Sequence, residues 1–328
     1  MSDADDRPGA EFDALPEDGD EFASLAEAAS EIALGPECVP QAERLSADIG
    51  DGQQVSVVRW GRGEPEVVFL HGGGQNARTW DLVLLGLGRP ALAIDLPGHG
   101  QSSWREDKDY GPGRNAEAVA AVLGELAPDA RGVVGMSLGG LTLIRLAAAH
   151  PGLVRRAVLV DVTPGSGEAS QRLTAEQRGT VALTSGPRTY PSREEMIEAA
   201  VRASPRRPAS AVRRGVIHNS RQLPDGTFAW RYDLPGPGLL TEIPTLWDDL
   251  GSLTMPVLLV KGAESAFTTE SDLAEVKRRL PAARVDVVPD SGHAVQSDQP
   301  AALTALLSAF LWNARPGTAA PLEEAVRG

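Results

Sequence analysis

GVVGMSLGGLTLIRLAAA, residues 132–149, is the stretch of sequence that determines the fold class. Its first residues form an apolar run typical of a buried strand, and the residues from Leu138 onward follow a helical pattern. Ser137 stands between the two elements, flanked by Gly135 and Gly139. A serine at a sharp strand-to-helix turn has strained backbone angles and crowded neighbours, so its flanking positions must lack bulky side chains. The stretch therefore predicts an exposed serine nucleophile rather than a glycine-rich helix start with an incidental serine.

On either side of this stretch, short β-branched runs alternate with longer helical patterns. The expected strands are residues 53–60, 66–70, 90–96, 131–135, 156–162, 256–261 and 283–288, and the expected helices are residues 115–126, 138–149, 270–280 and 300–312. Four of the strands are nearly continuous apolar runs, as expected when helices cover both faces of a sheet. This alternation predicts an α/β fold with a doubly wound, mostly parallel sheet.

Residues 164–250 break the alternation. They contain no convincing buried strand, but they do contain helical patterns such as residues 192–203, where Ser192 and Glu195 have the spacing of a capping box. We expect this segment to form a helical cap, or lid, over one edge of the sheet. The core would then consist of residues 46–163 and 251–315.

Both ends of the chain are expected to lie outside this core. Residues 1–45 form an acidic extension that we expect to be poorly ordered, because eleven of the first 31 residues are acidic and only one is basic. Within it, residues 21–34 could form one short amphipathic helix. Residues 316–328 are expected to be a C-terminal tail.

The composition excludes several classes of partner. The net charge of −14 offers no concentrated basic surface, so neither nucleic acid nor an anionic membrane is expected. No apolar run is long enough to span a bilayer, and no basic region followed by an apolar core marks a secretory signal. The single cysteine, Cys38, cannot form an internal disulfide, which fits a reducing compartment. These features predict a cytoplasmic protein with a small-molecule substrate, and they leave its oligomeric state open.

Two further motifs, together with the serine turn, resemble the α/β-hydrolase family over roughly residues 50–312. They are HGGG at residues 71–74 and DLPGHGQS at residues 95–102, each following an expected strand. The resemblance implies that the backbone N–H groups of Gly73 and Leu138 form an oxyanion hole. Four neighbours of these loops are expected to line the substrate pocket, namely Gly72, Gly74, Met136 and Phe267.

A serine nucleophile needs a base. His293 ends PDSGH, which follows the last expected strand, and the resemblance implies that the catalytic histidine comes last in the chain. We therefore expect His293 to be the base. The other histidines, His71, His99, His150 and His218, are expected to have structural roles. For His218, substrate contact is an alternative.

The third catalytic residue is less well defined, because the sequence departs here from the family's pattern. After the strand at 256–261, the positions where an aspartate is expected hold Ser265 and Ala266. Glu264 lies one or two residues early, and Asp161 ends the preceding strand, a location that some family members use. We favour Asp161 over Glu264. The acid must reach the ring nitrogen of the base that faces away from the serine, a distance that the sequence does not give.

These residues predict a serine hydrolase that cleaves an ester, a lactone or a related carbonyl compound through an acyl-enzyme. The alternatives are carbon–carbon bond hydrolysis or cofactor-free lyase or oxygenase chemistry on the same fold, and a non-enzymatic binding protein. Histidines and acids do not recur at metal-ligand spacing, and HGGG lacks the spacing of a dinucleotide-binding loop, so neither a metal nor a cofactor is expected.

The predicted cap is rich in arginine, and this leaves a further question open. An anionic substrate group is one reading of these side chains. A solvated basic face, or one that meets the acidic N-terminal extension, is the reading that we favour. The arginines concerned are Arg202, Arg206, Arg207, Arg213, Arg214 and Arg221.

Overall fold

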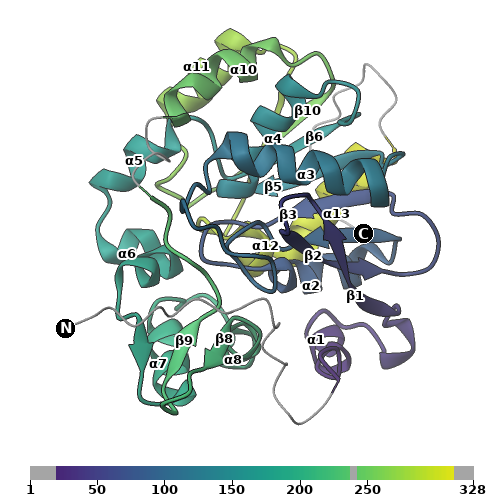
Figure 1. The fold of residues 1–328 in the computed structure, drawn as a ribbon. Coiled ribbons are helices and arrows are strands. Elements are labelled where there is room, and N and C mark those ends of the chain that lie inside the picture. Colours follow the sequence, from purple (N-terminus) through teal and green to yellow (C-terminus); the bar gives the residue numbers. More distant parts are fainter. Residues whose placement is uncertain (1–19, 237–241, 314–328) are drawn as a thin grey trace.

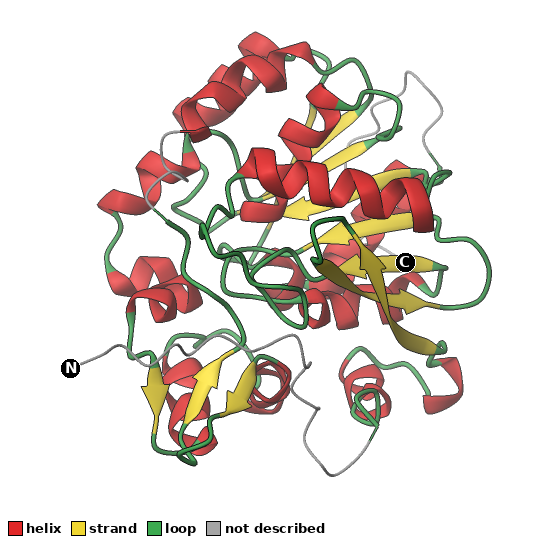
Figure 2. Cartoon of the chain, in the orientation of Figure 1, coloured by secondary structure: helices red, strands yellow, loops and turns green. Residues whose placement is uncertain are grey.

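The computed structural model describes residues 20–236 and 242–313, and its centre is an eight-stranded sheet (Figures 1 and 2). The strand order is β1-β2-β4-β3-β5-β6-β10-β11. The strands are β1 (Ala42–Asp48), β2 (Gln54–Trp60), β3 (Val67–Leu70), β4 (Ala91–Ile94), β5 (Gly132–Met136), β6 (Ala157–Val160), β10 (Val257–Gly262) and β11 (Arg284–Val288). Strand β2 runs antiparallel to both of its neighbours, and the other pairs are parallel.

Helices cover both faces of this sheet, as the sequence predicts (Figure 1). On one face, α3, α4, α10 and α11 share a hydrophobic core with the sheet, and α1, α2, α12 and α13 do so on the other. These helices are α1 (Leu25–Glu31), α2 (Asp81–Leu87), α3 (Pro112–Leu126), α4 (Leu138–Ala149), α10 (Leu246–Ser252), α11 (Glu270–Arg279), α12 (Val295–Asp298) and α13 (Pro300–Leu311). The short 3-10 helices η1 (Pro36–Cys38), η2 (Ala77–Trp80) and η4 (Ile243–Thr245) lie in connections.

The register of the parallel strands brings three loops to one edge of the sheet. Met136 at the end of β5 pairs with Val160 at the end of β6, and Val160 also pairs with Val260 in β10. Gly262, which ends β10, pairs with Val288 at the end of β11. The residues that follow these strands therefore meet at the carboxyl edge, where parallel α/β sheets bind their ligands.

From residue 20 onward the N-terminal extension is ordered, which differs from the poor order expected for this part of residues 1–45. Residues 1–19 lie outside the described part of the chain. From residue 20 onward the chain forms α1 within the expected helical stretch 21–34, then η1, and then β1 at the edge of the sheet. Leu25 and Ala29 are fully buried in the core beneath the sheet. Apolar burial on one face of α1 thus offsets the acidity that favours disorder.

The expected cap, residues 164–250, contains more than helices. Its helices are α5 (Ser166–Arg172), α6 (Ala175–Arg178), η3 (Gly179–Ser185), α7 (Arg193–Arg202) and α8 (Ala209–His218). It also holds a small antiparallel sheet in the order β7-β9-β8, made of β7 (Thr189–Tyr190), β8 (Ser220–Gln222) and β9 (Phe228–Trp230). These strands have two or three residues each, too few to show an alternating pattern in the sequence.

The boundary at residue 250 also shifts. Leu246 and Leu250 of α10 are buried in the main core beside α4, although the sequence assigns them to the cap. At the other end, the cap has a small core of its own that includes Met196, Val212 and Trp230. The expected C-terminal tail lies outside the described residues.

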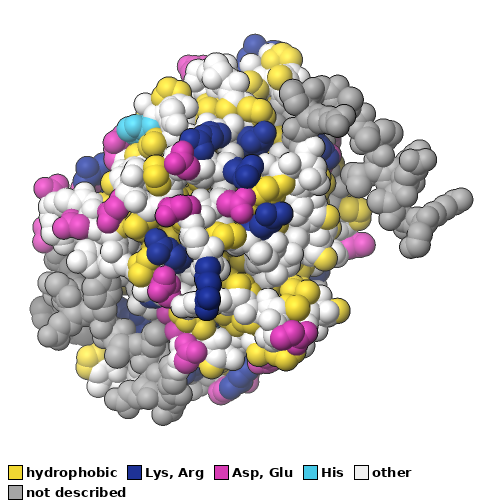
Figure 3. Space-filling view, turned by 90° about the vertical axis from the view of Figure 1, so that its right-hand side faces the viewer, with side chains coloured by type: hydrophobic (Ala, Val, Ile, Leu, Met, Phe, Trp, Pro, Cys, Tyr) yellow, Lys and Arg dark blue, Asp and Glu magenta, His cyan; other side chains and the backbone are white. Residues whose placement is uncertain are grey.

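Acidic and basic side chains are interspersed on the face of the molecule shown in Figure 3. No helix in the described ranges is long and apolar enough to cross a bilayer.

Candidate active site

Ser137 occupies a strained turn between β5 and α4. Its backbone angles are φ 50° and ψ −118°, a conformation that side-chain-bearing residues rarely adopt. A Cβ on Gly135 would lie 2.4 Å from the carbonyl oxygen of Gly139, and one on Gly139 would lie 2.4 Å from that of Leu70. The two flanking glycines are therefore required by close backbone contacts, as the sequence predicts.

His293 and Asp161 form a hydrogen-bonded pair at the same edge of the sheet. The Nδ1 atom of His293 lies 2.7 Å from Oδ2 of Asp161, and the Asp161 side chain is fully buried. Asp161 also accepts hydrogen bonds from the backbone N–H of Gly262 and from the hydroxyl of Ser265. The Phe267 ring stacks on the imidazole of His293, with centroids 3.7 Å apart. The imidazole is thus held on one face and at one nitrogen.

Glu264 makes a different contact from the one that a catalytic acid needs. Its carboxylate forms an ion pair with Arg206 of the cap, and its side chain is about half exposed. The neighbouring Ser265 occupies the place in the loop where the family's pattern expects an acid, and its hydroxyl donates to Asp161. Of the two acids that the sequence leaves open, only Asp161 contacts the His293 ring in this structure.

The HGGG loop wraps closely around the serine turn. A Cβ on Gly72 would lie 2.5 Å from Sδ of Met136 and 3.2 Å from Cβ of Ser137. His71 supports this loop by accepting a hydrogen bond from the N–H of Leu96 at 2.9 Å. His99 accepts one from the N–H of Gly74 at 3.1 Å. Burial lowers the pKa of both imidazoles, that of His71 to about 3, so they are neutral at ordinary pH and can act as acceptors.

The two expected oxyanion donors lie near each other. A Cβ on Gly73 would lie 4.0 Å from Cδ2 of Leu138. Among the described residues, neither backbone N–H donates a hydrogen bond to another group. Leu138 is the first residue of α4, where an N–H has no partner within the helix. Neither N–H group is therefore used by an internal hydrogen bond among the described residues, and Gly73 lines the cavity described next.

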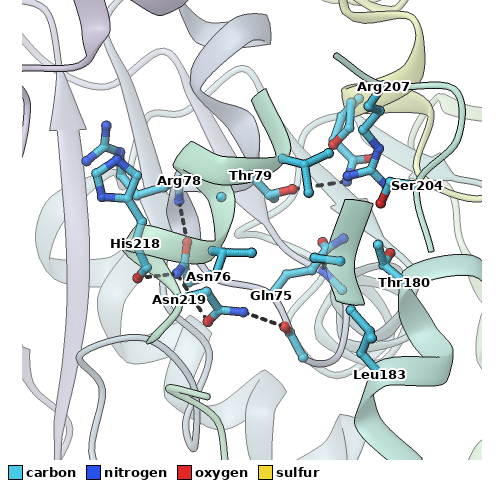
Figure 4. Close-up of a pocket in the computed structure, with 18 of the residues that line it drawn as sticks. Gln75, Asn76, Arg78, Thr79, Thr180, Leu183, Ser204, Arg207, His218 and Asn219 are labelled. Carbon is cyan, nitrogen blue, oxygen red and sulfur yellow. Dashed lines mark hydrogen bonds between the residues drawn. The ribbon is translucent and has the colours of Figure 1, made fainter. Parts of the chain in front are cut away.

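A cavity of about 170 Å³ lies between the core and the cap, next to the serine turn and the HGGG loop. Ser137, His293, Gly72, Gly74 and Met136 all line it. Cap residues close it from the other side, and Figure 4 shows Thr180, Leu183, Ser204 and Arg207 of the cap facing Gln75 and Thr79 of the core.

Phe267 is not among the residues that line this cavity, which corrects its expected place in the substrate pocket. Its ring is occupied by the stacking contact with His293, and only 3% of the residue is exposed. Phe267 therefore contacts the expected base rather than the pocket.

Several residues of the site carry no recognisable signal in the sequence. The side chain of Asn219, at the end of α8, donates a 2.8 Å hydrogen bond to the carbonyl oxygen of Gly74 and so ties the cap to the HGGG loop (Figure 4). Gln75 accepts a hydrogen bond from the N–H of Gly72. Asp298 accepts one from the N–H of Gly292, next to the expected base, and also pairs with Arg207. Isolated polar residues of this kind are common on surfaces, so only their contacts identify them.

The cap arginines that line the cavity are paired within the protein. Arg207 contacts Asp298 at 3.1 Å, and Arg214 contacts Glu27 and Glu31 of the N-terminal extension. For Arg214, the structure agrees with the reading in which the cap meets the acidic extension. Within the described ranges, no three histidine, cysteine, aspartate or glutamate side chains form a group that could hold a metal ion.

Comparison with known proteins identifies the family. A model of the alpha/beta hydrolase family matches residues 67–306, which is more than half of the chain. The esterase Rv0045c of Mycobacterium tuberculosis is 52% identical over 294 residues, which cover 89% of this chain and 96% of that protein. A crystal structure of that esterase superimposes with a TM-score of 0.78 at 48% identity, covering 91% of this chain and 99% of that one.

A more distant relative is described with a different activity. A protein of Bacillus subtilis described as a putative 2-succinyl-6-hydroxy-2,4-cyclohexadiene-1-carboxylate synthase is 28% identical over 276 residues, which cover 81% of this chain and 98% of that protein. The fold, the serine turn and the match of the family model agree with one another. The chain belongs to the alpha/beta hydrolase family.

Proposed function

We propose that this protein is a serine esterase in which Ser137 is the nucleophile, His293 the base and Asp161 the acid that orients the base. The observation that carries the proposal is the shared cavity. Ser137, in a strained turn, and His293, held by the buried Asp161, line the same space between core and cap. The 52% identity to a protein described as an esterase supports the same reaction class.

The first half of the reaction transfers the acyl group to the protein. The Ser137 oxygen attacks the ester carbonyl carbon while its proton passes to Nε2 of His293, a buried atom with no hydrogen-bond partner among the described residues. Asp161 accepts a hydrogen bond from Nδ1–H of His293 and stabilises the imidazolium that forms. The tetrahedral intermediate then collapses. The bond to the alcohol oxygen breaks, His293 returns its proton to that oxygen, and an acyl-Ser137 ester remains.

The second half uses water in the same way. His293 removes a proton from a water molecule as its oxygen attacks the acyl carbon, and the Ser137 oxygen leaves with that proton. In both halves the N–H groups of Gly73 and Leu138 would donate to the oxygen that gains charge. Losing one such donor typically costs about 3 kcal/mol of transition-state stabilisation.

We assign the pocket to the HGGG loop, Met136 and the cap. The HGGG loop and Met136 belong to the expected core, and the cap is the expected cap without α10. A small uncharged ester or lactone suits the cavity, because the charged side chains that line it are paired within the protein. The lone Cys38 fits a cytoplasmic location.

A second candidate function uses the same residues differently. The His293–Asp161 pair could abstract a proton from a substrate without help from Ser137, as in lyase chemistry or carbon–carbon bond cleavage. The distant relative described as a synthase favours this alternative. The paired cavity arginines and the much higher identity to an esterase favour ester hydrolysis.

A fluorophosphonate probe and one substitution test the proposal. Attack by Ser137 forms an oxygen–phosphorus bond and expels fluoride, so we expect stoichiometric labelling of the protein, located at Ser137 by peptide mass spectrometry. Ser137→Ala should abolish both labelling and hydrolysis of p-nitrophenyl butyrate. The exposed Ser271→Ala variant is the matched control and should keep both. Folded protein that is not labelled at Ser137 would contradict the proposal, and turnover that survives Ser137→Ala would favour the second candidate.

A further inference from the structure

Helix α1 lies against the cavity although it precedes the segment matched by the family model. Ala28, in the middle of this helix, lines the same cavity as Ser137 and His293. Leu25 and Ala29 turn toward the core, where they are 2% and 0% exposed. The acidic extension thus supplies part of the wall of the candidate active site.

The residues just before α1 are anchored to the core by a buried network of charged side chains. The carboxylate of Glu21 contacts the guanidinium of Arg44 at 2.5 Å, and Arg44 reaches the buried Asp95 at 2.8 Å. The backbone carbonyl of Glu21 accepts a 2.9 Å hydrogen bond from Arg78, whose guanidinium also lies over the ring of Phe22. Because these groups are largely shielded from water, the contacts fix the chain just before α1.

The helix itself is bound to α8 of the cap. Arg214 contacts Glu31 at 2.5 Å and Glu27 at 3.2 Å, and its side chain is only 12% exposed. Ser210 donates a 2.9 Å hydrogen bond to Glu31, and Ser24 contacts the ring of His218. Helix α1 therefore joins the core to the cap beside the cavity, and its position there is determined from both sides.

The part of the cavity next to α1 suits an uncharged aliphatic group of a substrate. Apolar side chains of three helices line it, namely Ala28, Leu82, Val212 and Val216. The guanidinium of Arg78 pairs with Asp81 at 2.7 Å, and Arg214 pairs with the two glutamates of α1. Burial lowers the pKa of His218 to about 3, so its ring is neutral. No unpaired charge among these described groups is left to recognise an ionic substituent.

We propose that α1 forms a wall of the acyl pocket and that the Ala28 side chain limits the length of the aliphatic acyl chain that the protein accepts. This inference rests on the proposed esterase function. The acyl group stays bonded to Ser137 until water attacks, whereas the alcohol leaves first. Because Ala28 and Ser137 line the same cavity, we assign the wall beside α1 to the acyl side. The small alanine at position 28 leaves room for the end of the substrate's acyl chain, and a larger side chain would occupy that room.

The test compares kcat/KM for p-nitrophenyl acetate, butyrate, hexanoate and octanoate in two variants. Ala28→Leu should lower the octanoate-to-acetate ratio at least tenfold, since one surplus methylene in a pocket changes kcat/KM by about 10-fold or more. Ala28→Gly removes a methyl group and should raise the same ratio about threefold. The exposed Ala26→Leu variant on the same helix is the matched control and should keep the unaltered profile.

The outcomes separate this inference from the function on which it rests. An unaltered protein that hydrolyses none of these esters and is not labelled at Ser137 would overturn the esterase proposal, and the inference with it. Hydrolysis with the same chain-length profile in the unaltered protein and Ala28→Gly would overturn the inference alone, even if Ala28→Leu failed to fold.

Discussion

Ser137 and Asp161 share an uncommon backbone conformation at the ends of neighbouring strands. Each has a φ of 50°, in the left-handed region that residues other than glycine seldom adopt. Such conformations cost about 1–3 kcal/mol each and persist where the surrounding structure enforces them. Asp161 is held there by its hydrogen bonds to Gly262, Ser265 and His293. Two of the six described non-glycine residues with a positive φ are therefore the residues that we propose as nucleophile and acid.

At the scale of single residues, we predict that Asp161→Asn lowers kcat for p-nitrophenyl butyrate by about 10³–10⁴-fold. Asparagine tolerates the left-handed conformation, so the fold should be kept, but an amide can neither stabilise the imidazolium nor hold the same tautomer of His293. Circular dichroism and a melting curve check the fold.

Glu264→Gln is the matched control for this acid. Its carboxylate contacts Arg206 rather than His293, so kcat should stay within about twofold. A large loss in Glu264→Gln together with a small one in Asp161→Asn would reverse the assignment of the acid.

At the scale of elements, the join between β5 and α4 depends on the absence of a side chain at residue 139. A methyl group there would meet the carbonyl oxygens of Leu70 and His71 at 2.4 and 2.6 Å, and neither backbone atom can move without shifting β3. We predict that Gly139→Ala lowers the free energy of unfolding by about 2 kcal/mol or more and reduces esterase activity. Urea unfolding measures the first effect.

A glycine-to-alanine substitution in α3 should have the opposite effect on the free energy of unfolding. Gly124 is exposed and helical, and a Cβ there would meet no atom within 4 Å. Gly124→Ala should therefore raise the free energy of unfolding by about 0.5–1 kcal/mol, because alanine loses less backbone entropy on folding. If Gly139→Ala and Gly124→Ala changed the free energy of unfolding equally, the close contacts at the serine turn would not determine its stability.

At the scale of the whole molecule, the contact of α1 with α8 joins segments that are about 180 residues apart (Figure 1). We predict that Glu31→Gln, which removes the charge that faces Arg214, speeds amide hydrogen exchange in α1 and α8 about fivefold, for a loss of about 1 kcal/mol. Exchange in α3 and α4 should not change. The exposed Glu125→Gln variant is the control, and equal exchange in both variants would contradict the coupling.

Stability should also fall as the pH is lowered, because buried histidines resist protonation. Burial lowers the pKa of His71 and of His218 to about 3, against about 6.5 in the unfolded chain. The unfolded chain therefore binds more protons below pH 6.5, so this stabilisation is complete above pH 6.5 and is lost progressively toward pH 3. In urea unfolding at pH 7.5 and 4.5, His218→Gln should lose less stability than the unaltered protein. An equal loss would show that His218 does not contribute.

Local patterns in the sequence were sufficient for the central fold and for the serine turn between β5 and α4. The seven expected strands and four expected helices lie where the structure has them, because apolar periodicity and the steric demands of a turn depend on near neighbours in the chain. The same steric reasoning pointed to Ser137 between its two glycines, whereas His293 was expected from its place after the last strand and from the resemblance to the family. Strand β1 and helices α2 and α10 were missed, since their short segments show no clear period.

Only the tertiary structure decided which groups meet across the chain. Asp161 and His293 are 132 residues apart, and no local pattern distinguishes Asp161 from Glu264 as the acid that reaches the imidazole. The order of the acidic extension likewise depends on what it packs against, because Glu31 is stabilised by Arg214 and Ala29 by the core. Hydrogen bonds and buried contacts between distant segments form only when packing brings them within a few ångströms, and a linear sequence does not record that distance.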